Sequence, residues 1–137
     1  MKVVDSTHKV IVPAGSYWLG DPCYSVPNDL WDDVLDSSGF FNKPIGTVAG
    51  FNVLAFRTAY GDGVYRDQHD NDYPVDAGLI GLTPVELAGH IPFGSHRVTF
   101  YRDTECTGHD GVMQFGDYKI NTRDDDPNYD DEDDEDD

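Results

Sequence analysis

Short apolar runs separated by glycine, proline and aspartate recur along most of this chain, and they limit what it can fold into. Examples are KVIV at 9–12, SYWL at 16–19 and LIGL at 79–82. Runs of four to eight residues between turn-forming residues are typical of β-strands. The sequence contains no internal repeat. It therefore predicts a mainly β, α+β fold, with an antiparallel sheet or a small sandwich or barrel.

One segment, residues 28–38, has a helical pattern. Its apolar residues fall on one face of a helix: Leu30, Trp31, Val34 and Leu35. Asn28 is expected to cap the first turn, and Gly39 to end the helix in a left-handed conformation. Three aspartates suit the positive end of the helix dipole: Asp29, Asp32 and Asp33. Trp31 is interpreted as a core residue rather than a ligand contact.

A central strand is predicted over residues 46–58, because residues 53–56 are apolar on both faces. Gly50 marks either a bulge or a hairpin corner in this region. Residues 84–88, PVELA, are expected to form one helical turn.

Two hairpins are also predicted. The first joins residues 64–66 to 73–75 across the polar loop DQHDND. The second joins residues 96–102 to 112–120 across DTECTGHDG, with a two-residue alternation of apolar and polar side chains in its first strand.

The last fourteen residues, 124–137, contain eleven acidic groups and no basic one. Residues 1–123 hold the other sixteen acidic and all nine basic residues, so their net charge is −7 of the total −18. We therefore expect a single β-rich domain over 1–123 and a disordered acidic tail over 124–137, since the tail has too little apolar surface to offset the entropy of ordering.

The charge also indicates the kind of partner. A chain this acidic repels nucleic acid and anionic membranes, and it attracts basic proteins, including those that hold DNA or RNA. An extended acidic segment carries a charge about every 3.3 Å, close to the spacing of about 3.4 Å along one DNA strand. The alternative is that the tail only increases solubility. The residues predicted to bind the partner are Asp124, Asp125, Asp126, Tyr129, Asp130, Asp131, Glu132, Asp133, Asp134, Glu135, Asp136 and Asp137.

Location and thiol state follow from other patterns. The first residues lack the apolar run of a signal peptide, and no segment approaches the eighteen apolar residues of a membrane helix. We expect a cytosolic protein in the cell that makes it. Cys23 and Cys106 do not resemble a secreted disulfide framework, so two reduced thiols are expected, with one disulfide as the alternative.

Three aspartates lie in glycine- or proline-flanked turns: Asp21 in GDP, Asp62 in GDG and Asp76 in VDAG. Aspartate beside glycine is what a tight turn requires, because its carboxylate bonds the local backbone. The alternative is a low-ranked ligand site, in which the three carboxylates converge to hold a cation or to act as acid and base. That alternative requires all three turns at the same end of the sheet.

Other chemistry is not predicted. Residues 67–72 echo a calcium loop, but Asp72 replaces the glycine at position six and Gly78 the glutamate at position twelve. Cys106 and His109 have CxxH spacing without the second ligand pair of a structural zinc site. The sequence has neither a GxSxG nor a phosphate-binding loop. We expect no metal, no cofactor and no catalytic residue.

Three stretches together carry a resemblance: SYWLGDPCY at 16–24, AYGDGVY at 59–65 and VDAGLIGLTPVEL at 75–87. In this order they resemble a group of small, functionally unassigned proteins of bacteriophage and bacterial genomes. The resemblance covers most of residues 15–120, leaves out the acidic tail and brings no catalytic residue. It implies a small phage accessory protein made in the host cytoplasm.

The leading hypothesis is a non-enzymatic phage protein that binds a basic, nucleic-acid-binding host protein and inhibits or modulates it by nucleic-acid mimicry. Two alternatives remain at this point. One is a hydrolase or small-ligand binder that uses the turn aspartates, and the other is a structural component of the virion.

Overall fold

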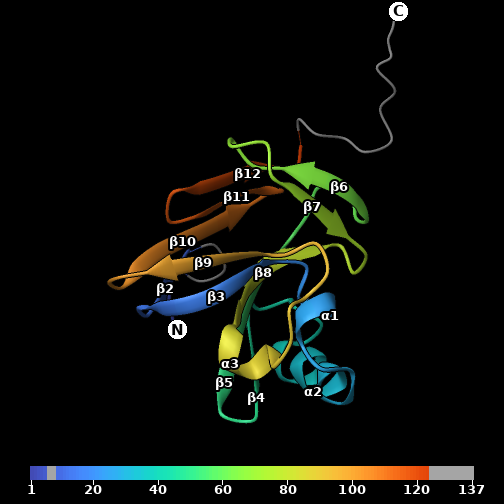
Figure 1. Cartoon of the computed structure of the whole chain (residues 1–137), viewed down its shortest axis with the longest axis vertical. Coiled ribbons are helices and arrows are strands. Elements are labelled where there is room, and N and C mark those ends of the chain that lie inside the picture. The colour runs from blue at the N-terminus through green and yellow to red at the C-terminus, as the bar shows by residue number, and fades with distance from the viewer. Residues whose placement is uncertain (6–8, 124–137) are drawn as a thin grey trace, which may run out of the picture.

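The computed structural model describes residues 1–5 and 9–123, and it confirms the mainly β fold class (Figure 1). Strands account for 48% of the structure and helices for 16%. All strand pairs are antiparallel, and they form an open sandwich of two five-stranded sheets with a separate two-stranded ribbon. Figure 1 shows the helices gathered at one end of the molecule, away from β6 and β12.

The first sheet contains the strands near the two ends of the described chain. In sheet order they are β1 (Lys2–Asp5), β2 (Lys9–Val12), β10 (Thr104–His109), β11 (Val112–Phe115) and β12 (Tyr118–Asn121). The second sheet is β4 (Ile45–Val48), β5 (Phe51–Arg57), β8 (Leu79–Pro84), β3 (Gly15–Gly20) and β9 (His96–Phe100). The ribbon pairs β6 (Gly63–Arg66) with β7 (Asp72–Val75).

Two apolar clusters hold these layers together. The larger draws side chains from both five-stranded sheets and from the ribbon, including the fully buried Tyr65, Tyr73 and Phe115. The smaller packs helix α2 (Asn28–Ser38) on β4 and β5, with Val34 and Val53 fully buried. Trp31 is partly buried against this second cluster, where its ring lies 6.4 Å from that of Phe41. Trp31 thus packs against the core, as interpreted, but it is only partly buried and is not one of the fully enclosed core residues.

The bounds of α2 match the predicted helix, but its capping residue does not. Pro27 is the N-cap, with no side-chain capping bond, and Asn28 is already in the first turn. The prediction was wrong because Leu30 N–H bonds to the carbonyl of Pro27, which starts the helix one residue earlier. Gly39 ends the helix as expected, with φ 63° and ψ 46°.

The predicted second hairpin is wrong. Residues 104–109, expected as a loop, form strand β10, and β9 pairs with β3 instead. Residues 112–120 fold back on themselves as β11 and β12. The inward-facing residues of β10 are Cys106 and Gly108, both buried, and two such small residues give little apolar signal in the sequence. Gly108 is required there, since a Cβ would lie 2.3 Å from the ring of Phe56.

The other strand predictions hold with one refinement. Residues 46–58 are not one strand but the hairpin β4–β5, and its corner is Ala49–Gly50. Both corner residues have positive φ, 52° and 82°, as a two-residue hairpin turn requires. The predicted 64–66 to 73–75 hairpin is confirmed as β6–β7, and the helical turn in PVELA as α3 (Val85–Ala88).

Candidate functional site

The three sequence motifs meet at one corner of the fold. β3 of the first motif pairs with β8 of the third, with Gly20 opposite Gly81. A Cβ on Gly78 would lie 3.5 Å from Gly61 Cα, so the loop of the second motif lies against the third. Thr58 connects the two, because its hydroxyl donates to the carbonyl of Gly61 at 2.7 Å and its N–H to that of Gly78 at 3.0 Å. The three turns are therefore at the same end of the sheet.

Asp21 ties this corner together through its carboxylate. It is completely buried and caps the short helix α1 (Pro22–Ser25), where Oδ1 accepts the N–H of Cys23 at 3.0 Å. Oδ2 accepts two further backbone N–H groups, from Asp76 and Ala77, each at 2.7 Å. Both carboxylate oxygens of Asp21 therefore accept backbone N–H groups. Oδ1 accepts within its own turn, and Oδ2 accepts from the turn of the third motif.

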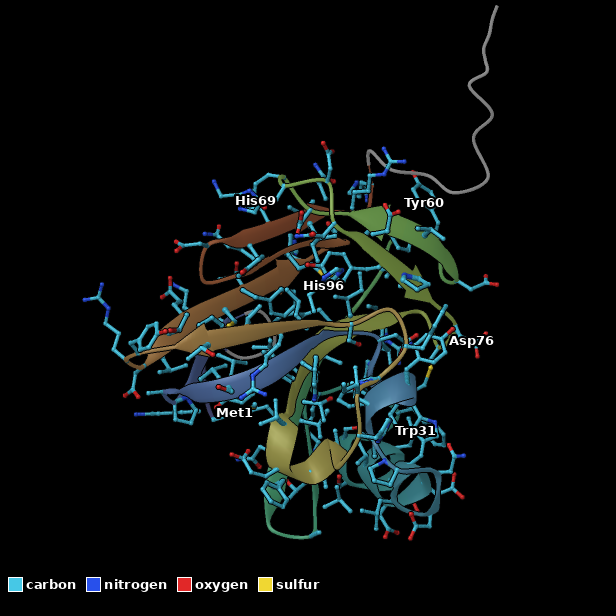
Figure 2. All side chains as sticks on the ribbon, viewed as in Figure 1. Met1, Trp31, Tyr60, His69, Asp76 and His96 are labelled. Carbon is cyan, nitrogen blue, oxygen red and sulfur yellow. The ribbon has the colours of Figure 1, made fainter. Side chains whose placement is uncertain are left out.

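The other two turn aspartates have a different environment. The side chains of Asp62 and Asp76 are exposed, and Figure 2 shows Asp76 at the outer edge of the molecule. Asp76 contributes its backbone N–H to Asp21, not its carboxylate. The turns come together, but one carboxylate is buried among amides while two face solvent. Across residues 1–5 and 9–123, no group of three or more His, Cys, Asp or Glu side chains is placed to hold a metal ion.

Both cysteines are free, which confirms the expected reduced thiols. Burial, together with the carboxylates of Asp21 and Asp76, raises the pKa of Cys23 to about 12. Burial also raises the pKa of Cys106 to about 12. Neither thiol is a nucleophile near neutral pH, because the thiolate is the reactive form. Cys106 is buried and His109 is exposed on the same strand, so the CxxH pair does not share a face.

Asp67 is a second buried carboxylate, which was considered from the sequence only as the first position of a calcium-like loop. It lies at the start of the β6–β7 loop and is 6% exposed. Oδ1 accepts the N–H groups of His69 at 2.8 Å and Asn71 at 3.1 Å. Oδ2 accepts the Asn71 side-chain amide at 2.9 Å and the Tyr73 hydroxyl at 2.7 Å. The loop that echoed a calcium site is thus folded around its own first aspartate.

The same contacts shift the acidity of both partners. Burial alone would raise the pKa of Asp67, but hydrogen bonds from Asn71, Tyr73 and His69 outweigh burial and lower it. Burial and the bond to Asp67 raise the pKa of Tyr73. Gln68 anchors the loop to the neighbouring hairpin, because its side chain bonds the carbonyl of Asp117 and the N–H of Lys119. These contacts show that Asp67, Asn71 and Gln68 stabilise the conformation of the loop.

The outer face of α2 carries a stripe of four carboxylates. Three of them, Asp29, Asp32 and Asp33, were predicted only to suit the positive end of the helix dipole, and the fourth, Asp36, was not considered. All four are exposed: Asp29, Asp32, Asp33 and Asp36. Within the described part of the chain, none of them forms an ion pair. Their spacing of i, i+3, i+4 and i+7 was the available signal, since it places all four on one side of a helix.

The predicted partner-binding residues of the tail, 124–137, lie outside the described residues. No helix within the described segments has the length and apolar composition needed to cross a membrane. Comparisons with protein-family models, with curated proteins and with solved structures find no match to this chain.

Proposed function

We propose that this protein is a non-enzymatic phage accessory protein that binds a basic, nucleic-acid-binding host protein and inhibits or modulates it. The acidic face of α2, defined as Asp29, Asp32, Asp33 and Asp36, is the observation that carries the proposal. It provides a folded, exposed anionic surface in addition to the acidic tail.

The charge spacing of this face resembles that of a nucleic-acid strand. An α-helix rises about 1.5 Å per residue, so Asp29 and Asp36 are separated by about 10.5 Å along the axis. Four carboxylates over that length give one charge about every 3.5 Å, and DNA has one about every 3.4 Å along each strand. A groove with basic side chains spaced for phosphates would therefore meet carboxylates at a similar density.

Helix stability does not account for the acidic face. Like charges at i,i+3 and i,i+4 each destabilise a helix by about 0.2–0.5 kcal/mol, and this face contains two pairs of each spacing. Asp36 lies in the last turn, which has no basic residue, and there it opposes the helix dipole. Asp29 in the first turn suits the helix dipole, but the mutual repulsion of the four carboxylates opposes helix stability, and none of them has an ion-pair partner among the described residues. Such charges are expected where another molecule supplies the cations.

The acidic tail adds further negative charge to the protein. Its eleven acidic groups belong to the total net charge of −18, which favours fast, salt-dependent association with basic proteins. The phage context is supported by the resemblance of the three motifs, and the non-enzymatic role by the structural roles of Asp21 and Asp67.

Affinity capture from a bacterial lysate tests the proposal with a matched charge control. The test variant replaces all four carboxylates of the α2 face by Asn. The control variant makes the same change in net charge at exposed acidic residues elsewhere: Asp62, Glu86, Asp103 and Asp117. We expect the wild type and the control to retain nucleic-acid-binding proteins that are released by duplex DNA and by salt. The α2 variant is expected to lose most of them.

Equal retention by the two variants would contradict a role for α2. A chain that ends at Arg123 provides the corresponding test of the tail, with capture at low salt expected to fall strongly. Capture of the same proteins in the same amounts by that shorter chain would contradict the role of the tail.

A further inference from the structure

The loop that follows α3 holds two large apolar side chains in contact with solvent. Ile91 is 84% exposed and Phe93 is 67% exposed. Pro92, which lies between them in the chain, is buried, so the loop is anchored at its centre. Exposed apolar side chains that occur together, rather than singly, are typical of interaction sites. Residues 91–93 are called the apolar loop below.

Both ends of the apolar loop are held in place. Gly89 ends α3 with φ 69°. Gly94, with φ 67°, lies so close to β7 that a Cβ there would be 2.2 Å from Cγ of Pro74. The loop is therefore joined to α3 at one end and packs on the ribbon at the other.

Contacts with α1 also hold the loop. Both ring nitrogens of His90 lie within hydrogen-bond distance of a carbonyl oxygen, Nδ1 at 2.6 Å from that of Ala88 and Nε2 at 3.0 Å from that of Tyr24. The rings of Tyr24 and Phe93 meet edge to face, with their centroids 5.2 Å apart. Tyr24 thus supports one edge of Phe93 and leaves most of this side chain exposed.

A rigid loop of this kind has the properties of an interface anchor. Aromatic residues are enriched in protein–protein interfaces, where a few anchors supply most of the binding energy. Binding is opposed by the entropy of ordering loops and side chains at the interface. Because contacts with α1 and β7 already order the apolar loop, this entropic cost is reduced.

The apolar loop lies near the helix that carries the acidic face. α1 leads into α2 through Val26 and Pro27, and Figure 1 shows the chain after α3 passing both helices. Five residues of chain span at most about 18 Å, which limits the distance between the Cα atoms of Tyr24 and Asp29. A typical interface covers about 800 Å² of each partner, or about 32 Å across if it is round. One partner can therefore contact both the apolar loop and the start of the acidic face.

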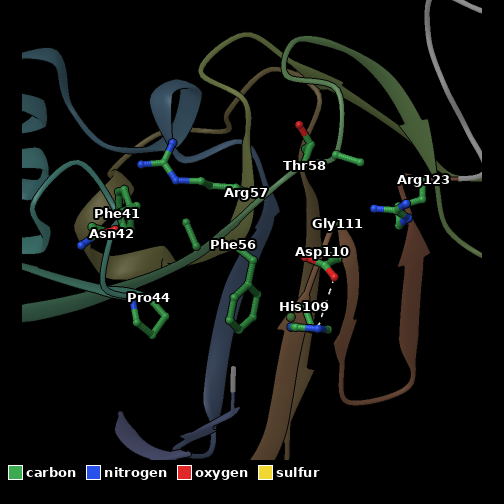
Figure 3. Close-up of a pocket in the computed structure, with 13 residues that line it drawn as sticks. Phe41, Asn42, Pro44, Phe56, Arg57, Thr58, His109, Asp110, Gly111 and Arg123 are labelled. Carbon is green, nitrogen blue, oxygen red and sulfur yellow. Dashed lines mark ion pairs between the residues drawn. The ribbon is translucent and has the colours of Figure 1, made fainter. Parts of the chain in front are cut away.

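The acidic face of α2 remains open to the cations of a partner. Within the described part of the chain, no ion pair involves its four carboxylates. Arg57 donates from Nη2 to the carbonyl of Phe40, directly after α2, and Figure 3 shows Arg57, Phe41 and Asn42 along one cavity. This arginine therefore binds the backbone that follows the helix. A partner that approaches α2 is expected to bring its own basic groups.

We propose that the apolar loop is a second contact for the partner of the acidic face, and that Ile91 and Phe93 enter an apolar pocket beside the basic groove of that protein. This inference rests on the proposed function and adds the apolar pocket to it. The two contacts have different physical roles. The charges on α2 speed association and are screened by salt, whereas the buried apolar contact slows dissociation and is little affected by salt.

Photocrosslinking in bacterial cells tests whether the two contacts share a partner. The full chain carries p-benzoylphenylalanine at one position at a time: Phe93 on the loop, Asp32 on the acidic face or, as the control, Tyr101, which is 92% exposed at the turn from β9 to β10. We expect the chains substituted at Phe93 and Asp32 to crosslink to the same basic, nucleic-acid-binding protein, identified by mass spectrometry. The chain substituted at Tyr101 should not crosslink to it.

The dissociation rate from that protein tests the apolar contact separately. It is measured at about 0.5 M salt, which screens exposed charges. The double variant Ile91→Ser, Phe93→Ser should dissociate at least about tenfold faster than the wild type. The control Tyr101→Ser should dissociate at the wild-type rate. All three side chains are exposed, so both variants should keep the fold, which circular dichroism checks.

The results that would overturn the inference are distinct from those that would overturn the proposed function. A basic protein crosslinked at Asp32 but not at Phe93, or an unchanged dissociation rate in the double variant, would overturn the apolar contact alone. Crosslinking at Phe93 to a second copy of the chain, or to a protein that does not bind nucleic acid, would overturn the shared partner. Absence of crosslinks at both positions would overturn the proposed function and the inference together.

Discussion

Asp21 and Asp67 are both buried aspartates whose two oxygens accept hydrogen bonds, but they hold different things together. Asp21 accepts N–H groups of Asp76 and Ala77, 55 and 56 residues away in the sequence. Asp67 accepts from partners at most six residues away, in its own hairpin. The carboxylate of Asp21 therefore joins segments that are distant in the sequence, whereas the carboxylate of Asp67 stabilises the conformation of a single hairpin loop.

This difference predicts how each carboxylate contributes to stability. Contacts across the core are lost only when the whole domain unfolds, whereas a loop can open by itself. Asp21 should therefore affect global stability, and Asp67 chiefly local opening. Four measurements can sharpen or break this comparison.

The largest effect is expected from Asp21→Ala. Removal of this completely buried carboxylate takes away the acceptor of three partly buried backbone hydrogen bonds, from Cys23, Asp76 and Ala77. We expect the free energy of unfolding in urea to fall by about 3 kcal/mol. Asp21→Asn keeps one oxygen acceptor and should lose less. A loss below about 1 kcal/mol in the alanine variant would break the comparison.

A smaller loss, about 2 kcal/mol, is expected from Asp67→Ala, because a loop can partly rearrange around the missing acceptor. Hydrogen exchange measures where the effect lies. The amides of His69 and Asn71 should exchange faster while those of β8 keep their protection, and Asp21→Ala should accelerate both. Faster exchange throughout the sheets in Asp67→Ala would show that the loop is not a separate unit.

The pH dependence of stability should reveal Asp67 as well. Its folded-state pKa is lower than the ordinary value of 3.8, so the ionised carboxylate stabilises the fold above that value. This contribution is lost as the pH falls through the lower, folded-state pKa. The stability difference between wild type and Asp67→Asn should be constant above about pH 5 and shrink below about pH 4. A difference that persists undiminished to the acid-unfolding range would contradict the lowered pKa.

The smallest effects are expected from Asp62→Asn and Asp76→Asn. Both carboxylates are exposed, and Asp76 serves Asp21 through its backbone, which the substitution leaves intact. Each variant should change the free energy of unfolding by less than about 0.5 kcal/mol. A loss comparable to that of Asp21→Ala would mean that the three carboxylates act together.

Local patterns in the sequence predicted much of the fold. The helix over 28–38 and the β6–β7 hairpin were predicted correctly because apolar spacing and turn residues determine them over short distances. β10 was missed because its buried positions hold Cys106 and Gly108, and Gly108 is required by the close approach of Phe56 in the other sheet. When packing against another sheet selects small residues at the inward positions, the strand lacks the two-residue apolar alternation by which a strand is recognised in a sequence.

The candidate sites show the same limit. That Asp21 lies in a turn could be read from its glycine and proline neighbours, but not which amides it accepts. The role of Asp67 had only a weak signal, the tendency of aspartate to bond N–H groups two residues on. Tyr24 and His90 are 66 positions apart, and only the packing of the loop after α3 on α1 brings them together.

The strand order has a consequence for how the chain folds during synthesis. β2 pairs with β1 and also with the much later β10. β3 lies between β8 and β9, and both of these neighbours are synthesised some sixty to eighty residues after β3. The second sheet has all its strands only after residues 96–100 have left the ribosome, and the first only after residues 118–121 have. Such distant pairings slow folding and leave strand edges open in the meantime. In the nascent protein, strand edges in the first half of the chain therefore stay unpaired until strands of the second half have been synthesised.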